Sequence, residues 1–489
     1  MTQKPLVRAV LVAAMGLTLG QCSYNPATGG QQFTAFMSPE QERQTGAQQH
    51  PEILKQFGGA YGDAKVRAYV DTLGKALATK AGLPAGQFTF TVLDDPLVNA
   101  FALPGGYVYV TRGLMALANS EAELAAVIGH EMGHVMARHT AERYSRANVA
   151  GIGSTILGVI LGSPEVSQLA QQGSQLYLLS FSRGQELEAD KLGVRYIRAA
   201  DYDPFAEADF LSTLGRDSEM EAKIAGQQLP ESDFLQTHPN TPKRVEEAIA
   251  EAEGTGLKPD PARRYPDRYL DIVNGLLYGE DPAQGVLRGG AFLHPALGLA
   301  FDVPKGLQLS NSEDAVVLQA SRDSGIIFDG AKAATGQSAA QYLENVWAKN
   351  VTLAGLHQFR VGNMEAASGA ARVQTQSGML EMHLTVIRFA PDQVYRFQLI
   401  SPPSPSDALL SAFDKVVTSF HRLSAADHAR AKPYRVHVIT VGAGDTLATL
   451  AKRMPFTDSY NVQRLVVLNA LRTENDIRPG QRLKIITAD

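Results

Sequence analysis

Residues 120–136 read SEAELAAVIGHEMGHVM, and this stretch decides the organisation of the chain. Its apolar residues recur at helical spacing, and Ser120 followed three positions later by Glu123 is a capping box that predicts where the helix begins. His130 and His134 stand four positions apart, so both imidazoles are expected on one helix face, where they can point at a single metal ion. Zinc suits neutral imidazole, and two such ligands leave room for a third ligand and a water molecule.

Three neighbours of these histidines sharpen the prediction. Glu131 can reach the water as a base. Gly129 and Gly133 each weaken the helix by about 1 kcal/mol relative to alanine, which suggests that another element approaches closely. His139 comes nine positions after His130, on the opposite face at about 100° per residue, so we expect it at the surface or in a second layer and not as a ligand. The alternative is a chance HExxH pattern on a buried helix.

A second helix is predicted around Glu186-Leu187-Glu188-Ala189-Asp190. Glu186 and Asp190 share a face, whereas Glu188 is rotated by about 200° from Glu186 and points elsewhere. One carboxylate can complete the ligand set, and the other can accept a hydrogen bond from a ligand imidazole, which ligand histidines nearly always need. The alternative is an ordinary solvated acidic face.

Together these elements resemble the gluzincin zinc metallopeptidases of the CAAX prenyl protease, HtpX and BepA type. The resemblance runs from about residue 25 to residue 252 and includes the stretch NAFALPGGYVYVTRGL at residues 99–114. It implies one zinc ion per chain and a peptidase mechanism. The implied ligands are His130, His134 and Glu186, with Glu131 as the catalytic base and Asp190 behind a ligand histidine.

The resemblance also bears on a later histidine. In BepA-like relatives a His-Pro motif supplies a histidine that can cap the metal, and here His238 precedes Pro239, with Arg244 following as the relatives' arginine does. A regulatory cap at His238 is therefore expected. The alternative is an ordinary loop histidine before a helix.

Residues 99–109 are expected to form a strand, a Pro-Gly-Gly turn and a second strand beside the metal. The exposed edge, with Asn99, Ala100 and Phe101, could hold an extended peptide by backbone hydrogen bonds. Because that binding mode tolerates many sequences, broad endopeptidase specificity is expected.

The chain begins like an exported protein. Lys4 and Arg8 precede the apolar stretch of residues 9–19, which fits the h-region of a signal peptide. Leu19-Gly20-Gln21-Cys22 resembles a bacterial lipobox, although Gln21 departs from the small residue that lipoproteins prefer there. Lipidation of Cys22 would give a lipid-anchored protein of the bacterial periplasm, with Ser23 favouring the outer membrane. The alternative is an ordinary secreted protein with an incidental cysteine.

The expected class is α+β, divided into a signal peptide (1–22), a flexible tether (23–40), a mainly helical zinc-peptidase domain with a small active-site sheet (41–252), an accessory α/β domain (268–423) and a small βααβ domain (434–489). The last resembles LysM modules, which bind peptidoglycan; its marks are Gly-Asp-Thr-Leu at 444–447, Leu-Asn at 468–469 and Pro-Gly-Gln-x-Leu at 479–483. A LysM-like fold that has lost sugar binding is the alternative. The accessory region shows no recognisable chemistry.

Composition limits the remaining possibilities. The chain has 489 residues, 45 Lys and Arg against 50 Asp and Glu, and one cysteine. No excess of basic residues favours binding to nucleic acid. With one cysteine, neither an intrachain disulfide nor a Cys-rich zinc site is possible. The leading hypothesis is a zinc endopeptidase acting on unfolded or misassembled envelope proteins, held to the membrane by lipid alone. The alternatives are a peptidoglycan-associated binding or chaperone-like protein with a latent metal site, and a peptidoglycan-cleaving metalloenzyme.

Overall fold

The computed structural model describes residues 22–149, 181–225, 238, 242–312, 314–375, 378–473 and 476–489. The chain divides into two compact units, the first formed by Met1–Gly279 with Tyr434–Ala488 and the second by Glu280–Pro433. The expected signal peptide lies outside the described residues except for Cys22. No helix in the described part of the chain is long and apolar enough to cross a membrane.

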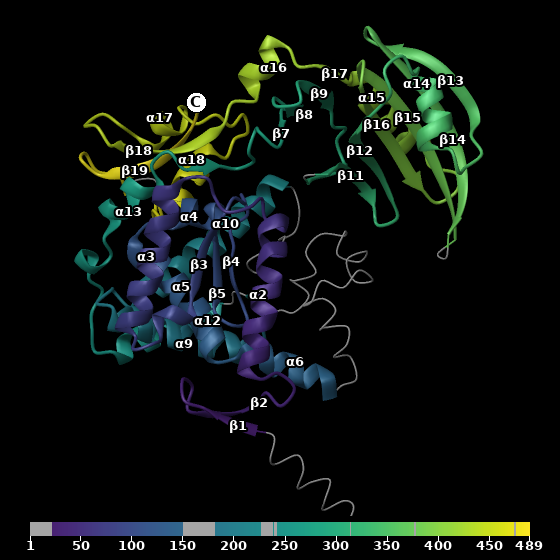
Figure 1. The fold of residues 1–489 in the computed structure, drawn as a ribbon. Coiled ribbons are helices and arrows are strands. Elements are labelled where there is room, and N and C mark those ends of the chain that lie inside the picture. Colours follow the sequence, from purple (N-terminus) through teal and green to yellow (C-terminus); the bar gives the residue numbers. More distant parts are fainter. Residues whose placement is uncertain are drawn as a thin grey trace, which may run out of the picture. The chain divides into compact units, whose positions relative to one another are not determined.

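The first unit places helices around a small sheet (Figure 1). Strand β3 (Thr89–Leu93) pairs in parallel with β5 (Tyr107–Thr111), and β4 (Ala100–Leu103) pairs antiparallel with β5 and forms an edge. The expected strand, turn and strand are thus present. The helices are α2 (Pro39–Gln56), α3 (Ala64–Lys80), α4 (Arg112–Leu117), α5 (Glu121–Met136), α6 (His139–Val149), α9 (Arg183–Ala199), α10 (Ala206–Ala225), α12 (Pro242–Gly254) and α13 (Pro266–Val273).

Helix α5 begins where the sequence predicts. The Ser120 hydroxyl accepts a hydrogen bond of 3.2 Å from the Glu123 backbone N–H. The Glu123 carboxylate reaches one residue further back than in a standard capping box and accepts from the Asn119 N–H at 2.7 Å. Two of the donors exposed at this helix end therefore have partners.

The close approach that the glycines of α5 predict is made by α9. A Cβ added at Gly129 would lie 3.3 Å from the Gly193 Cα, and one at Gly133 would lie 3.0 Å from the Ala189 carbonyl oxygen. Because side chains at these positions would separate the two backbones, glycine allows α9 to lie against α5.

In place of the expected flexible tether, the start of the described chain is a hairpin of β1 (Cys22–Asn25) and β2 (Gly30–Phe33). The Asn25 side-chain amide donates to the Met136 carbonyl at 2.9 Å, and the Gln32 amide donates to the Ala137 carbonyl. These carbonyls are at the C-terminal end of α5, where helices leave acceptors without internal partners. The composition of residues 23–40 favoured a flexible tether. Composition alone does not show that the side-chain amides of Asn25 and Gln32 cap a distant helix.

The LysM-like module has the expected βααβ order: β18 (Tyr434–Thr440), α17 (Leu447–Ala451), α18 (Asn461–Leu468) and β19 (Arg482–Ala488). The module is not an independent domain, because its strand β18 also pairs with β6 (Leu277–Tyr278) of the preceding chain. Lys484 is fully buried, and its ammonium donates to the carbonyls of Ala116, Leu117 and Ala118 at 2.7, 3.1 and 2.6 Å. The module therefore packs against the turn from α4 into α5.

The second unit is built on a seven-stranded antiparallel sheet in the order β10-β11-β12-β16-β15-β14-β13 and a four-stranded sheet in the order β17-β9-β8-β7. Strands and helices are both present in this unit, as they are in the first, so the α+β class is confirmed. The bounds are β7 (Val286–Arg288), β8 (Ala291–His294), β9 (Leu299–Asp302), β10 (Gln308–Asn311), β11 (Val316–Ser321), β12 (Ser324–Lys332), α14 (Ala339–Tyr342), β13 (Ala354–Val361), β14 (Met364–Thr375), β15 (Gly378–Ala390), β16 (Gln393–Ser401), α15 (Asp407–Ser419), β17 (His421–Arg422) and α16 (Ala425–Arg430).

Candidate metal centre

Four buried side chains bring their ligand atoms together between α5 and α9. The Nε2 atoms of His130 and His134 are 3.0 Å apart, and the Glu186 carboxylate oxygens lie 3.7 and 3.5 Å from them. The Nδ1 atom of His238 is 3.1 Å from Glu186 Oε1 and 3.3 Å from His130 Nε2. The three expected ligands and the expected cap therefore share one site, and their ligand atoms lie within 4.8 Å of one another.

This donor set fits zinc. Ligands held at about 2.0–2.1 Å around a tetrahedral zinc ion are separated from one another by roughly 3.4 Å, and the separations here range from 3.0 to 3.7 Å. Two imidazole nitrogens that face each other need a shared proton or cation between them. Burial and the neighbouring histidines hold the pKa of His134 well below its usual value, which favours a neutral ring with a lone pair for a metal.

Asp190 orients His130 from behind. Its carboxylate lies 2.8 Å from His130 Nδ1, so it can accept that N–H and leave Nε2 directed at the metal. Arg244 binds the same carboxylate through two nitrogens, at 2.8 and 2.6 Å. Burial would raise the pKa of Asp190, but Arg244 and His130 hold that pKa far below its usual value. The expected position of Asp190 behind a ligand histidine agrees with this geometry.

Arg244 contacts both a ligand carboxylate and the expected cap, because its Nη1 also donates to the His238 carbonyl oxygen at 3.4 Å. It lies 2.8 Å from Glu186 Oε2, so it forms ion pairs with Glu186 and with Asp190. Burial would raise the pKa of Glu186, but His238 and Arg244 lower that pKa below its usual value and keep the carboxylate ionised. Arg244 thus compensates the two buried negative charges of α9.

His134 is supported differently, by His139, expected at the surface or in a second layer, and by Glu188, whose part the sequence did not predict. His139 is fully buried, and its Nδ1 lies 2.9 Å from His134 Nδ1, while its Nε2 lies 3.0 Å from the Glu188 carboxylate. Glu188 accepts the Nε2–H of His139, so His139 Nδ1 can accept from His134 and leave the Nε2 of His134 for the metal.

His139 lies in a second layer behind His134, as expected. The reason given for that expectation, that His139 faces away from His130 on the same helix, does not hold. Helix α5 ends at Met136, and Arg138 turns the chain with a φ of 52° before α6 begins at His139. The rotation of 100° per residue therefore stops before His139. Glu188 is absent from the ligand cluster, as expected, and contacts His139 beyond the end of α5.

Glu207 of α10 is a further residue that the sequence did not indicate. It is buried, and one of its oxygens lies 4.0 Å from His130 Nδ1. Burial and the adjacent Asp190 raise the pKa of Glu207 well above its usual value, which favours the neutral carboxyl over the carboxylate. Its distance along the chain from either motif gives no periodic signal that could have identified it.

Glu131 is the buried group beside these ligands with unused hydrogen-bonding capacity. It is fully buried, and neither carboxylate oxygen has a hydrogen-bond partner among the described residues. Its Oε1 lies 3.5 Å from His238 Nε2. Burial raises the pKa of Glu131, which makes the carboxylate a stronger base than one in water.

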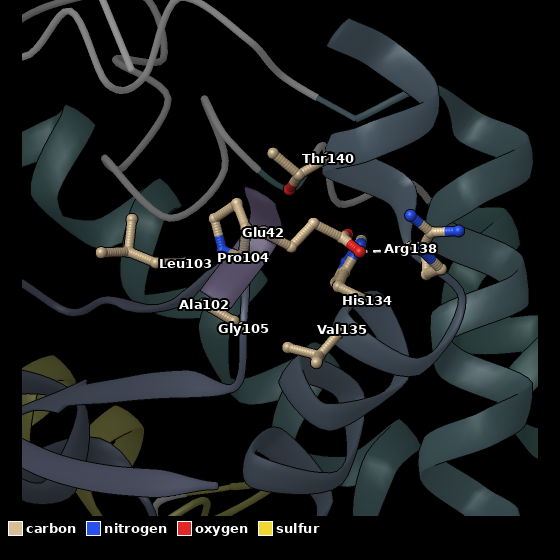
Figure 2. Close-up of a pocket in the computed structure, with 9 residues that line it drawn as sticks. All are labelled: Glu42, Ala102, Leu103, Pro104, Gly105, His134, Val135, Arg138 and Thr140. Atoms are coloured by element: carbon tan, nitrogen blue, oxygen red, sulfur yellow. Dashed lines mark hydrogen bonds and ion pairs between the residues drawn. The ribbon is translucent and has the colours of Figure 1, made fainter. Parts of the chain in front are cut away.

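The edge strand β4 lies alongside this centre. Figure 2 shows a small cleft lined by Ala102 and Leu103 of β4 and by His134 of α5. Glu42 of α2 and Arg138 close one side with an ion pair of 2.8 Å. The backbone edge expected to hold a peptide is therefore next to a metal ligand, although Asn99 precedes β4 and is fully buried.

Comparisons with known proteins agree with the motifs. Residues 64–252 match Peptidase family M48, and residues 439–485 match the LysM domain. Over 171 residues the chain is 37 % identical to Mitochondrial metalloendopeptidase OMA1 of Arabidopsis thaliana, a match that covers 35 % of this chain and 33 % of that protein. Over 231 residues it is 32 % identical to the Beta-barrel assembly-enhancing protease of Yersinia pestis, covering 45 % of each.

The Escherichia coli (strain K12) Beta-barrel assembly-enhancing protease is 28 % identical over 280 residues, which cover 54 % of this chain and 55 % of that protein. The chain thus spans between a third and just over half of these three relatives. The expected resemblance to a BepA-like peptidase with a C-terminal LysM module is confirmed.

The contact between His139 and His134 gives a first prediction. His139→Leu should lower zinc affinity by about 10- to 100-fold, because His134 then loses the acceptor that fixes its tautomer. Zinc affinity is measured by competition with a chromogenic chelator, and His428→Gln, at an exposed histidine of the second unit, is the matched control. Equal zinc affinity of the wild type and a folded His139→Leu variant would show that His139 does not orient His134.

Proposed function

We propose that this protein is a zinc-dependent endopeptidase that hydrolyses peptide bonds of unfolded or misassembled envelope proteins. The observation that carries the proposal is the arrangement of Glu131, buried and without a hydrogen-bond partner among the described residues, beside the ligand atoms of His130, His134 and Glu186. A chance HExxH pattern does not explain why residues from two helices converge with separations suited to zinc.

Each group has a defined task in this mechanism. Zinc held by the three ligands would polarise the scissile carbonyl and lower the pKa of water to about 7. Glu131 accepts the proton of the attacking water and donates it to the amine that leaves as the peptide bond breaks. Asp190 and His139 hold the two imidazoles in the required tautomer, and Arg244 balances the charge of the α9 carboxylates.

Strand β4 supports an extended substrate. Its outer edge is not paired with another described strand, and its residues Ala102 and Leu103 share a cleft with His134. A peptide added antiparallel or parallel to this edge would run past the metal and be held by main-chain hydrogen bonds. Such binding selects extended, unfolded chains over folded ones.

The setting in the envelope is part of the proposal. The match to Beta-barrel assembly-enhancing proteases suggests envelope substrates. The LysM domain supports peptidoglycan as a partner through residues 434–489. The signal-like residues 1–22 suggest a bacterial periplasmic location, with a lipid on Cys22 anchoring the chain to the outer membrane. Because β1 begins at Cys22, that anchor would join the hairpin that caps α5.

The catalytic base can be tested directly. Glu131→Gln should still bind one zinc per chain, because the ligands remain, but should cleave unfolded casein at least about 100-fold more slowly, because the base is lost. Metal content and cleavage rate are measured on the same preparation, with Glu253→Gln at an exposed position as control. Undiminished cleavage by Glu131→Gln would contradict this mechanism and favour the alternative of a binding or chaperone-like protein.

His238 is proposed as a regulatory cap. A zinc ion held by three ligands keeps one position for water. The His238 Nδ1 atom lies among the ligand atoms, 3.1 Å from Glu186 Oε1, where it could serve as a fourth ligand in place of that water. Occupation of that position would hold the enzyme latent among unfolded envelope proteins. The surrounding Thr237 and Pro239 lie outside the described residues.

The cap predicts the sign of a mutational effect. His238→Ala should raise the rate of casein cleavage and keep zinc, because the water position opens while three ligands remain. If His238 instead stabilises the developing oxyanion, the same change should lower the rate, typically by 10²–10³-fold. A zinc-bound His238→Ala protein slower than the wild type would therefore end the cap hypothesis.

The anchor predicts a change in location. In a bacterial host, the full chain should fractionate with the outer membrane and carry lipid on Cys22, whereas Cys22→Ser should be soluble or remain unprocessed. Fractionation and mass spectrometry of the amino-terminal peptide make the comparison. A mature protein cleaved elsewhere, with an unmodified Cys22, would contradict the anchor.

A further inference from the structure

A second cavity lies where the LysM domain packs against the rest of the first unit, and it has a volume of about 390 Å³. Small-molecule sites usually enclose about 300–1,000 Å³ behind mainly apolar walls with a few polar groups. Apolar walls come from the loop before β4, from α4 and α10, and from the LysM domain; they include Leu97, Leu117, Met220, Met454 and Ile486. None of the metal ligands lines this cavity.

The polar groups of the cavity are adjacent on α10. Asp217, Ser218 and Glu221 all line it. Ser218 is only 5 % exposed, and its hydroxyl has no hydrogen-bond partner among the described residues. A hydroxyl buried without a partner loses the hydrogen bonds it would make to water, so a ligand that supplies one is favoured.

Charge in the cavity is unbalanced. Arg464 is the cation that lines it, but Asp458 already binds Arg464 through two oxygens, at 2.6 and 2.7 Å. Asp217 forms no ion pair in the described part of the chain. Burial, together with Glu221, raises the pKa of Asp217 to about 7. Glu221 shares the attraction of Arg464 with Asp458, whereas no cation among the described residues acts on Asp217.

We propose that this junction cavity binds a ligand that presents a protonated primary amine on an apolar body. The amine would sit against the carboxylate of Asp217 and the hydroxyl of Ser218, both of which can accept its hydrogens. The apolar body would contact Leu97 and the facing LysM residues. A free alkylamine and the amino terminus of an apolar peptide share this chemistry.

Other ligand classes fit less well. An anion would face two carboxyls and an arginine that is already paired. A metal ion would need a third ligand besides Asp217 and Glu221. Among the described residues, clusters of three or more possible metal ligands occur only around His130. A neutral apolar molecule would leave the buried Ser218 hydroxyl without a partner, at a cost of about 1–3 kcal/mol, and would offer nothing to the half-buried Asp217.

The test uses the full, zinc-loaded chain and titration calorimetry at pH 8. Hexylammonium should bind with a stoichiometry of one, and hexan-1-ol, its neutral counterpart, should bind at least about 10-fold more weakly, because it lacks the charge-assisted bond. Leucyl-leucinamide with a free amino terminus, compared with its N-acetylated form, tests the peptide source. The proposal is supported if either amine binds and its neutral counterpart binds more weakly or not at all.

Variants separate the charge from the apolar wall. Asp217→Asn should weaken hexylammonium at least about 10-fold and leave hexanol unchanged, whereas Glu219→Gln, at an exposed position of the same helix, should change neither. Leu97, 42 % exposed, can be replaced without loss of the fold, and Leu97→Ser should weaken both probes.

The proposal also predicts a pH profile. The affinity for hexylammonium should fall below pH 7 as Asp217 becomes protonated, and the raised pKa of the neighbouring Glu221 adds to this fall. Hexylammonium and Arg464 stay protonated, Asp458 stays ionised beside Arg464, and Tyr278 stays neutral. Equal affinities of hexylammonium and hexanol, absence of saturable amine binding, or unchanged amine affinity in Asp217→Asn would each overturn the proposal. Because the readout is binding, these outcomes do not depend on peptidase activity.

Discussion

The metal centre depends on the close crossing of α5 and α9. At Gly129 and Gly133 the two helix backbones come so near that an added Cβ would meet α9 at 3.3 and 3.0 Å. Glycine costs each helix about 1 kcal/mol per position. That loss permits a separation at which carboxylates of α9 can reach imidazoles of α5, and larger side chains would move the acidic ligand away from the histidines. The site is thus a consequence of backbone proximity.

Burial of so many ionisable groups requires compensation, because an unpaired buried charge is very unfavourable. Arg244 supplies most of it, since it binds both Glu186 and Asp190. The two histidines then receive their orientation from separate partners, Asp190 for His130 and His139 for His134. Glu131 is buried with neither oxygen hydrogen-bonded to another described residue, and this leaves it able to accept a proton.

Both ends of the metal-binding helix are held by segments far away in the sequence. The hairpin that begins at Cys22 caps its C-terminal carbonyls through Asn25 and Gln32. At the other end, Lys484 of the LysM domain binds the carbonyls that precede the helix. The segments expected to face a membrane and peptidoglycan are therefore bonded to the region around α5, so neither is a freely attached module.

The sequence by itself determined the helix start at Ser120, the shared face of His130 and His134, and the paired carboxylates of the second helix, because spacing within one helix fixes direction locally. Only the tertiary structure decided that Glu207 lies beside His130, that Glu188 binds His139, that the amino-terminal segment caps α5, and that the LysM domain closes a cavity. These contacts join residues from different elements, and their distances are set by packing and by turns such as that at Arg138, which no periodic pattern encodes.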